Sequence, residues 1–183
     1  MIFDTHAHLN VFEFKDDKDE LIEKCLKEGI GMINVGTNFN NSKKAVEISE
    51  KHPNVFASIG LHPLNIKSEF FKNKEYEGDD GILEKDFDYE AYKALKNDKV
   101  VAIGEIGLDY WYKPKGTGKK ESFKQEQRII FEKQLDLAEE LNLPIILHCR
   151  SAFDDLFEIL SKRKIKGVLH CFTGSKEEAE RFL

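Results

Sequence analysis

The sequence predicts an α/β fold in which successive βα units build a parallel sheet. Short apolar runs alternate along the chain with longer segments whose apolar residues recur every three or four positions, and this alternation is typical of βα units. Several of the short runs are nearly continuous stretches of valine and isoleucine, as expected of strands that are covered on both faces. With 183 residues, 40% of them hydrophobic, the chain can bury a core and is expected to form one domain.

Each element follows from its local pattern. The expected strands are Ile2–Thr5, Met32–Val35, Val55–Ile59, Val100–Gly104, Pro144–His148 and Gly167–His170. The expected helices between them are Asp19–Glu28, Ser42–His52, Tyr89–Asn97, Gln125–Asn142 and Ala152–Lys162. In the last of these helices, apolar residues from Phe153 to Leu160 recur at helical spacing and form one stripe. Ser175 begins a final segment with the pattern of a capped helix start.

The composition limits the kinds of molecule that the protein is expected to bind and the cellular compartment in which it is expected. A formal net charge of -6 at pH 7 argues against a protein that coats nucleic acid through bulk electrostatics, although a local basic patch or bound cations can still receive a phosphate. Cys25, Cys149 and Cys171 are odd in number and follow no disulfide pattern, and no leader precedes Asp4. A cytoplasmic protein with chemically inert cysteines is therefore expected. No apolar run approaches the roughly 18 residues needed to cross a bilayer, so no membrane partner is expected.

Histidine and glutamate side chains stand at the carboxyl ends of the expected strands. His6 and His8 are two residues apart at the end of the first strand, where alternation directs both imidazoles to one face. Glu105 follows Val101 and Ile103 at two-residue spacing and ends the fourth strand, and His148 and His170 end the fifth and the sixth. A lone histidine at a strand end is most often a structural residue, but a parallel sheet opens its site at these ends and brings such residues together. The sequence therefore predicts a metal site.

The donor set indicates two cations rather than one. Four imidazoles and a carboxylate exceed the ligands of a single tetrahedral zinc, whereas Glu105 can bridge two cations about 3.5–4 Å apart with a histidine pair on each. Such a pair of cations lowers the pKa of a bound water and clamps the attacking and leaving oxygens of a phosphoryl displacement. The same apparatus hydrolyses an amide or a carboxylic ester, so the donors predict a hydrolase without choosing its substrate.

Five motifs carry a resemblance to a known family. They are Asp4–Leu9 (DTHAHL), Gly60–Pro63 (GLHP), Gly104–Tyr110 (GEIGLDY), Leu147–Arg150 (LHCR) and Leu169–Ser175 (LHCFTGS). Through them the chain resembles, over nearly its whole length, the TatD metal-dependent deoxyribonucleases, a branch of the amidohydrolase-like TIM barrels. The carboxylate of Glu105 favours this branch over amidohydrolases that bridge their metals with a modified lysine.

The resemblance implies a fold, a ligand set and an activity. The fold is a TIM-type (β/α)8 parallel barrel, of which only about six βα units are present in this chain. The resemblance places one metal on His6 and His8, with Glu105 as the bridging, catalytic carboxylate. The second metal is assigned to His148 and His170. The implied cofactors are two divalent ions of magnesium, manganese or zinc, and the implied activity is 3′-to-5′ exonuclease action on DNA, on single strands or 3′ ends.

Other polar residues near the strand ends are candidates for contact with the substrate. His62, just before Pro63 at the end of the third strand, is a candidate catalytic and substrate-binding residue, because its imidazole can hydrogen-bond a phosphate oxygen or assist the leaving group. Arg150 can grip phosphate bidentately, and Asp109 can orient a metal ligand or pair with a cation. Pairing of Arg150 with Asp109 is an equal alternative.

The segment after Glu105 combines aromatic and basic side chains. Tyr110, Trp111 and Tyr112 are followed in an expected loop by Lys113, Lys115, Lys119 and Lys120. Aromatic faces between lysines suit a single strand whose bases stack while Lys119 and Lys120 neutralise its phosphates. A solvated loop with core-facing rings is an equally good interpretation. The acid-rich stretch 75–90 is excluded as a nucleic-acid groove and is expected to be an exposed elaboration.

Six strands are expected in this sequence, whereas a closed (β/α) barrel needs eight. Residues 1–183 are therefore expected to form a single incomplete (β/α) barrel domain without strands 7 and 8, as an amino-terminal fragment of a longer protein. The resemblance adds an aspartate ligand from the eighth strand, and no motif within residues 1–183 matches it. Two other hypotheses stay open, an amidohydrolase or aminoacyl-ester deacylase and a truncated, non-catalytic metal-binding remnant.

Overall fold

The computed structural model describes residues 1–11, 14, 16–68, 82–112 and 114–183. The strands are β1 (Ile2–Ala7), β2 (Ile30–Val35), β3 (Val55–Ile59), β4 (Val100–Asp109), β5 (Ile145–Arg150) and β6 (Gly167–Leu169). The helices are α1 (Lys18–Lys27), α2 (Phe39–Lys51), the 3₁₀ helix η2 (Pro63–Asn65), α3 (Tyr89–Ala94), α4 (Thr117–Glu140), α5 (Phe153–Leu160) and α6 (Lys176–Arg181). Of these described helices, none has the length and apolar character that a membrane span requires. In the acid-rich stretch 75–90, residues 75–81 lie outside the described part of the chain.

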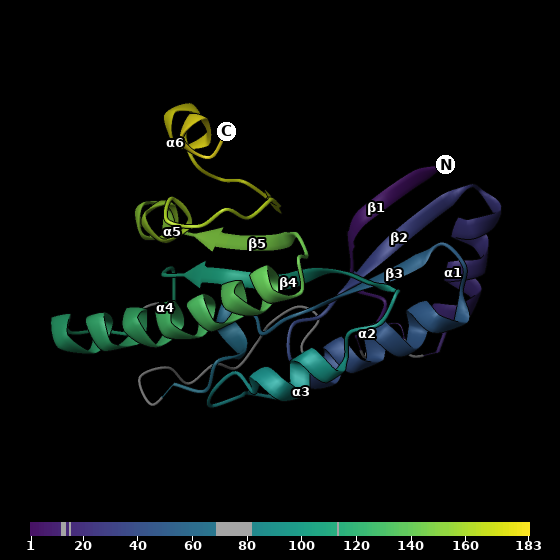
Figure 1. Cartoon of the computed structure of the whole chain (residues 1–183), viewed down its shortest axis with the longest axis horizontal. Helices are drawn as coiled ribbons and strands as arrows, with labels where there is room; N and C mark the ends of the chain where they lie inside the picture. Colours follow the sequence, from purple (N-terminus) through teal and green to yellow (C-terminus); the bar gives the residue numbers. More distant parts are fainter. Residues whose placement is uncertain (12–13, 15, 69–81, 113) are drawn as a thin grey trace.

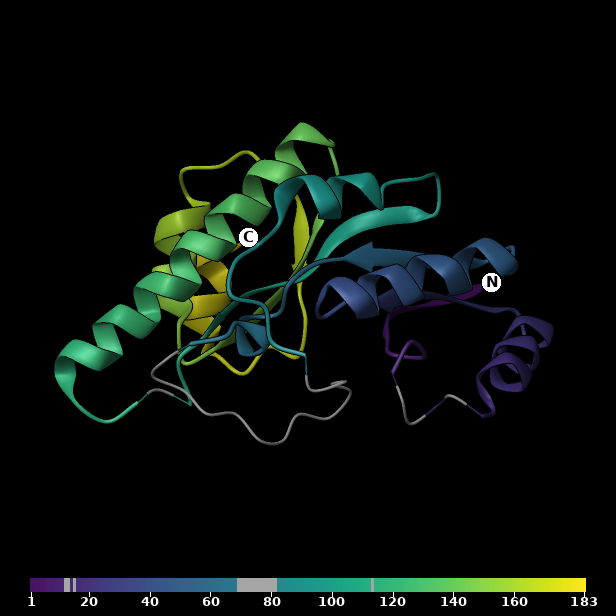
Figure 2. The same cartoon turned by 90° about the horizontal axis from the view of Figure 1, so that it is seen from below.

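The strands lie side by side in the order of the sequence. Each pairs in parallel with the next, from β1 to β6, without the reversal of strand order that marks a doubly wound sheet. Figure 1 and Figure 2 show the sheet with α2, α3 and α4 along one side of it. Sequential parallel strands with helices between them form a curled half-barrel of the TIM type. The predicted fold class is therefore confirmed.

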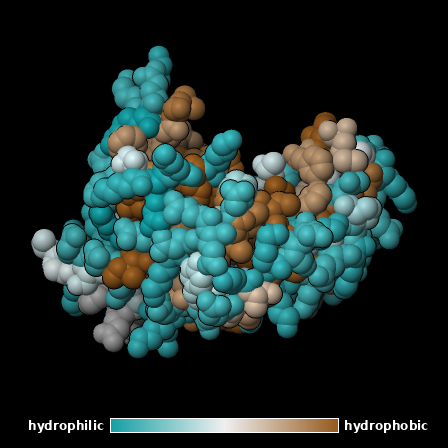
Figure 3. All heavy atoms as spheres, viewed as in Figure 1, coloured by the Kyte–Doolittle hydropathy of each residue, from teal (hydrophilic) through white to brown (hydrophobic). Residues whose placement is uncertain are grey.

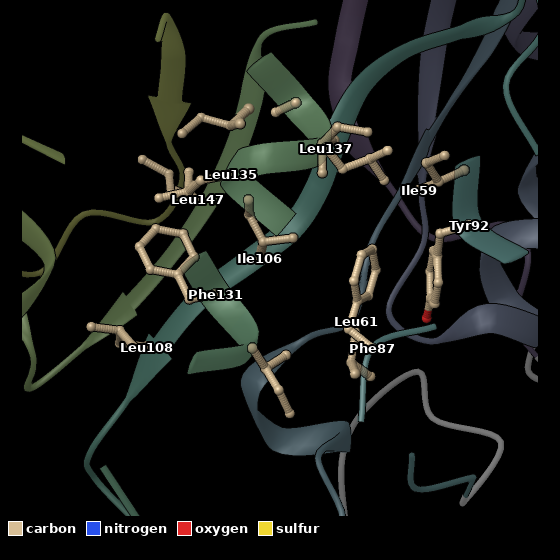
Figure 4. Packing of buried hydrophobic residues seen from close by; sticks show 14 of the residues in the cluster. Ile59, Leu61, Phe87, Tyr92, Ile106, Leu108, Phe131, Leu135, Leu137 and Leu147 are labelled. Carbon is tan, nitrogen blue, oxygen red and sulfur yellow. The ribbon is translucent and has the colours of Figure 1, made fainter. Parts of the chain in front are cut away.

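The main core lies between the sheet and its covering helices. Figure 4 shows side chains of α4 facing those of β4 and β5. The labelled members from these elements, all buried, are Phe131, Leu135, Leu137, Ile106, Leu108 and Leu147. A smaller buried group, Val35, Ala102 and Ile146, comes from three strands of the sheet. Because Ile146 precedes His148 by two residues and shares its face of β5, this group forms the floor beneath the side chains of the site.

Strand β4 is longer than predicted and carries Glu105 within it. The predicted end at Gly104 is wrong, since β4 continues to Asp109 and its register with β5 shifts between Ile103 and Ile106. Gly107 makes the continuation possible: its φ is +143°, and a Cβ there would lie 2.0 Å from the carbonyl oxygen of His148. The extension brings Asp109 into the strand.

Helix α4 begins earlier than the predicted start at Gln125. It starts at Thr117, directly after Gly116, whose φ of +96° turns the chain into the helix. The first turn is polar and shows no helical repeat of apolar residues. Phe123 in the next turn is buried and packs this end of the helix against the protein. Lys119 and Lys120 therefore lie in the first turn of α4, and their predicted placement in a loop is wrong.

The outer strands of the described sheet, β1 and β6, each have one edge without a partner strand. Apolar side chains are exposed there: Ile2 is 73% exposed and Val168 is 47% exposed. Figure 3, drawn in the view of Figure 1, shows hydrophobic surface near both ends of the chain. Strand β6 also ends at Leu169, so that His170 is the first residue beyond it rather than its last.

Candidate metal centre

Five histidines and one glutamate from successive strand ends converge on one side of the sheet. They are His6 in β1, His8 just after it, His62 after β3, Glu105 in β4, His148 in β5 and His170 just after β6. Each of the five imidazoles has a ring nitrogen within 4.0 Å of a carboxylate oxygen of Glu105. The structure thus brings together all the residues that the sequence predicts as metal ligands, and His62 with them.

The two oxygens of Glu105 face different histidines. Oε2 lies 3.2 Å from Nε2 of His6 and 4.0 Å from Nε2 of His8. Oε1 lies 3.1 Å from Nδ1 of His148 and 2.8 Å from Nε2 of His170. Glu105 is only 4% exposed, so both oxygens are directed at these partners and away from bulk water.

Burial and the histidines pull the pKa of Glu105 in opposite directions. Burial alone would raise the pKa, because it disfavours the carboxylate. The electrostatic interaction with His62 and the hydrogen bonds from His148 and His170 outweigh burial, and they hold the pKa of Glu105 well below its usual value. Glu105 is therefore ionised at neutral pH, as a metal ligand must be.

Hydrogen bonds to the backbone assign the tautomers of His8 and His62. Nδ1 of His8 lies 3.2 Å from the carbonyl oxygen of Val35, to which it donates, and its Nε2 lone pair is left facing Glu105. Nδ1 of His62 instead accepts from the backbone N–H of Leu64, so its proton sits on Nε2. Burial lowers the pKa of both imidazoles and keeps them neutral. His8 is thus prepared to be a metal ligand, and His62 to be a hydrogen-bond donor.

His148 bridges two carboxylates. Its Nδ1 faces Glu105 and its Nε2 lies 3.0 Å from Oδ2 of the fully buried Asp109. Burial alone would lower the pKa of His148, but the two carboxylates outweigh it and raise the pKa to about 9. An imidazole held on its far side by a carboxylate is the usual arrangement of a metal-ligating histidine. Of the two interpretations of Asp109, the structure favours orientation of this ligand over pairing with Arg150.

The residues present fit a divalent metal. Both ring nitrogens of His6 are buried, and Nδ1 makes no hydrogen bond to the described residues, while Nε2 faces only the Glu105 carboxylate at 3.2 Å. A bound cation would relieve the cost of such a buried, unpaired nitrogen. The rings of His6 and His170 stack at 3.9 Å with an interplanar angle of 8°, so the two predicted histidine pairs are in contact. His6, His8 and Glu105 offer ligand atoms within 4.8 Å of one another, and so do His62, Glu105 and His148.

Comparison with known proteins assigns the family. The sequence profile of the family described as TatD related DNase matches residues 3–183. The chain belongs to the TatD family. The predicted family is thereby confirmed.

Relatives of this TatD chain have hydrolase and nuclease names. The uncharacterized metal-dependent hydrolase YabD of Bacillus subtilis is 38% identical over 98% of this chain and 64% of its own length. The 3′-5′ ssDNA/RNA exonuclease TatD of Salmonella typhimurium is 32% identical over 98% of this chain and 62% of its own length. The crystal structure of YJJV, a TatD homologue from Escherichia coli K12, is 30% identical with a TM-score of 0.77 and covers 99% of this chain and 64% of that one. The chain thus spans less than two thirds of each of these relatives.

In this TatD chain Arg150 packs on aromatic rings. Its guanidinium carbon lies 4.7 Å from the ring centroid of Trp111 and 5.5 Å from that of Tyr112. The three consecutive aromatic residues do not behave alike. Tyr110 is buried and its hydroxyl donates to Asp155, whereas Trp111 and Tyr112 are exposed. Tyr110 therefore follows the core-facing interpretation, and the exposed rings of Trp111 and Tyr112 stay compatible with stacking on a nucleic acid.

Two buried glutamines of α4 support the TatD site and are not predicted from the sequence. Gln134 accepts from the N–H of Leu61 and donates to its carbonyl oxygen, next to His62. Gln127 forms the same pair of hydrogen bonds with the backbone of Asp109. The two glutamines are on the apolar side of α4, each about 1% exposed. A polar residue recurring at a seven-residue interval on an apolar helix face is the sequence signal that could have identified them.

Proposed function

We propose that this chain forms the metal-binding part of a nuclease that hydrolyses phosphodiester bonds of DNA from the 3′ end with two divalent cations. The observation that carries the proposal is the division of the Glu105 carboxylate between two histidine pairs. Its Oε2 faces His6 and His8, and its Oε1 faces His148 and His170. A carboxylate flanked in this way has the geometry of a bridging ligand between two cations. The name of the Salmonella relative supports a nucleic-acid substrate.

Each residue has a distinct task in this proposal. The bound cations would supply Lewis acidity and lower the pKa of a water molecule. His8 is held by the carbonyl of Val35, so that Nε2 is its donor atom, and Asp109 keeps the ring of His148 in place. His62 donates from Nε2–H to a phosphate oxygen of the substrate, because its Nδ1 is already engaged by the N–H of Leu64. His62 is therefore proposed as a substrate contact rather than a ligand.

Among magnesium, manganese and zinc, the donor set favours zinc. Four of the five proposed ligand side chains are imidazoles, from His6, His8, His148 and His170. Imidazole nitrogen suits zinc, whereas magnesium and manganese prefer oxygen ligands, and magnesium keeps several waters. Metal analysis of the protein after equilibration with all three ions tests this preference, and retention of magnesium alone would contradict it.

The experiment compares substrates of different chemical class. Protein loaded with zinc or manganese is incubated with single-stranded oligonucleotides labelled at the 5′ or the 3′ end, with an aminoacyl ester and with an N-acyl amide. Mononucleotides released successively from the 3′ end, and lost on addition of a chelator, are expected. Cleavage of the ester or the amide without phosphodiester cleavage would support a deacylase or amidohydrolase instead. Metal binding without any hydrolysis would support the non-catalytic remnant.

The last two strands of the expected (β/α)8 barrel are a further part of this proposal. Strands 7 and 8 and an aspartate ligand are expected from the family resemblance alone, and the chain covers 64% of the length of YabD. We propose that such an aspartate, acting beside His6 and His8, belongs to the complete active site. The cytoplasmic compartment and the preference for DNA over RNA are equally predictions.

A further inference from the structure

An exposed aromatic pair stands beside the metal centre and has no role in the chemistry described so far. Trp111 is 60% exposed and Tyr112 is 39% exposed, directly after β4. The backbone N–H of Trp111 donates to Oδ1 of Asp109 over 2.9 Å, and Oδ2 of the same carboxylate contacts Nε2 of His148. A single side chain therefore links the backbone of Trp111 to a proposed metal ligand.

Arg150 supports the indole from the neighbouring strand. Asp109 and Arg150 are register partners in β4 and β5, which places the guanidinium beside the start of the Trp111 segment. The guanidinium packs on the ring of Trp111 at 4.7 Å, a cation–π contact that orients the indole and adds positive charge next to its face. Lys119 and Lys120 come later in the sequence, in the first turn of α4. Trp111 and Arg150 thus combine a flat apolar surface with a cation, on a chain of net charge -6.

We propose that Trp111, backed by Arg150, is a stacking site for an unpaired nucleobase of the strand whose phosphodiester bond is cleaved. An indole with most of its surface in water is unusual for so large an apolar side chain, whereas an aromatic face combined with cations is how proteins hold single-stranded nucleic acid. Every base has a stacking face, so the site accepts any sequence. A base within a duplex is already stacked, so the site selects frayed or single-stranded ends. This subsite rests on the nuclease function proposed above.

The chain itself provides the probe, because Trp111 is its single tryptophan. Its intrinsic fluorescence is titrated with a short oligothymidylate in the presence of a chelator, so that nothing is hydrolysed. The matched ligand is an abasic oligomer of the same length and charge. We expect quenching by the oligothymidylate and little change with the abasic oligomer. Equal quenching by both, or quenching by neither, would overturn the stacking site.

Substitutions separate stacking from simple charge attraction. Binding of fluorescently labelled oligomers is measured for Trp111→Ala and Trp111→Phe. Loss of one stacked base should weaken binding of the oligothymidylate by about tenfold, without weakening binding of the abasic oligomer. Trp111→Phe should retain most of the affinity, because a phenyl ring still stacks. An equal loss for both oligomers in Trp111→Ala, with unchanged circular dichroism, would contradict the proposal.

The nuclease and the stacking site fail in different ways. Base-dependent quenching with no phosphodiester cleavage by the metal-loaded protein would refute the nuclease and leave a nucleobase site. Cleavage of oligonucleotides without base-dependent quenching would refute the stacking site and leave the nuclease. Absence of both would refute both.

Discussion

Gln134 of α4 pairs with the backbone of Leu61 through both polar atoms of its side-chain amide, at 2.7 Å and 3.0 Å. The amide thus satisfies the backbone N–H and carbonyl of Leu61, as a paired strand would, just beyond the end of β3. Gln127 does the same for Asp109 at the end of β4. Helix α4 therefore positions His62, the residue after Leu61, as well as the carboxylate that orients His148.

Replacing Gln134 with alanine should destabilise the protein and displace His62. The substitution leaves a buried N–H and a buried carbonyl of Leu61 unpaired, each of which costs about 1–3 kcal/mol. We expect a loss of about 2–6 kcal/mol in the free energy of unfolding, measured by urea denaturation. Gln125→Ala, on the exposed side of the same helix, is the control. Equal stabilities of the two variants would show that the paired amide contributes nothing.

Glu105→Ala should remove metal from both proposed sites together. A bridging carboxylate is a ligand of each cation, so its loss weakens both and abolishes hydrolysis. Metal content after dialysis and cleavage of a 3′-labelled oligonucleotide are the two measurements. Glu158→Ala removes a half-exposed carboxylate of α5 and should change neither. Full metal content in Glu105→Ala would refute the bridging assignment.

The order of βα units and the convergence of polar side chains at strand ends could be predicted, because both depend on patterns local to each strand. Alternation in β1 and β5 directs His6 and His148 to the inner side, and parallel pairing then brings them together without any further information. The site floor of Val35, Ala102 and Ile146 follows from the same alternation.

The features that escaped prediction depend on contacts between distant segments. Gly107 lies within β4 because the carbonyl of His148 requires room there, and this neighbour is unknown until β5 is in place. Helix α4 begins at Thr117 because Gly116 has a positive φ, a property that the polar residues after it do not reveal. Burial likewise separates Tyr110 from Trp111, since it depends on where α4 and α5 pack.

Substituting alanine for Lys119 and Lys120 together should weaken nucleic-acid binding at low salt while leaving the fold intact. Two lysines in the first turn of a helix oppose the helix dipole, so their removal should not lower stability. Each contact to a phosphate of a single strand contributes about 0.7 to the slope of log affinity against log salt, and we expect the slope to fall by about 1.4. Lys164→Ala with Lys166→Ala, exposed residues before β6, is the matched control. An unchanged slope would assign Lys119 and Lys120 to solvent alone.

Cys149 should resist alkylation although it follows a residue of the site. Burial raises the pKa of its thiol to about 12, and the thiol, unlike the thiolate, does not react with iodoacetamide. Cys171 is exposed in the turn after β6 and should be modified in the folded protein. Mass spectrometry of digests gives the extent of labelling at each cysteine, with protein unfolded in urea as the control in which Cys149 reacts. Labelling of Cys149 in the folded state at the rate of Cys171 would contradict its assignment as an inert core residue.

Without metal, the protein should lose stability as pH rises above neutrality. The carboxylates of Glu105 and Asp109 raise the pKa of His148 from 6.5 to about 9, so the folded state holds a proton that the unfolded state releases. The stabilisation is complete below pH 6.5 and disappears as pH rises through about 9. Its size is on the order of 3 kcal/mol. Urea denaturation in the presence of a chelator should show this decline in the wild type and in His52→Gln, which removes a histidine at the end of α2. His148→Gln keeps a hydrogen-bond donor but cannot titrate, so its profile should be flat over the same range, and a decline as steep as that of the wild type would assign the effect to another group.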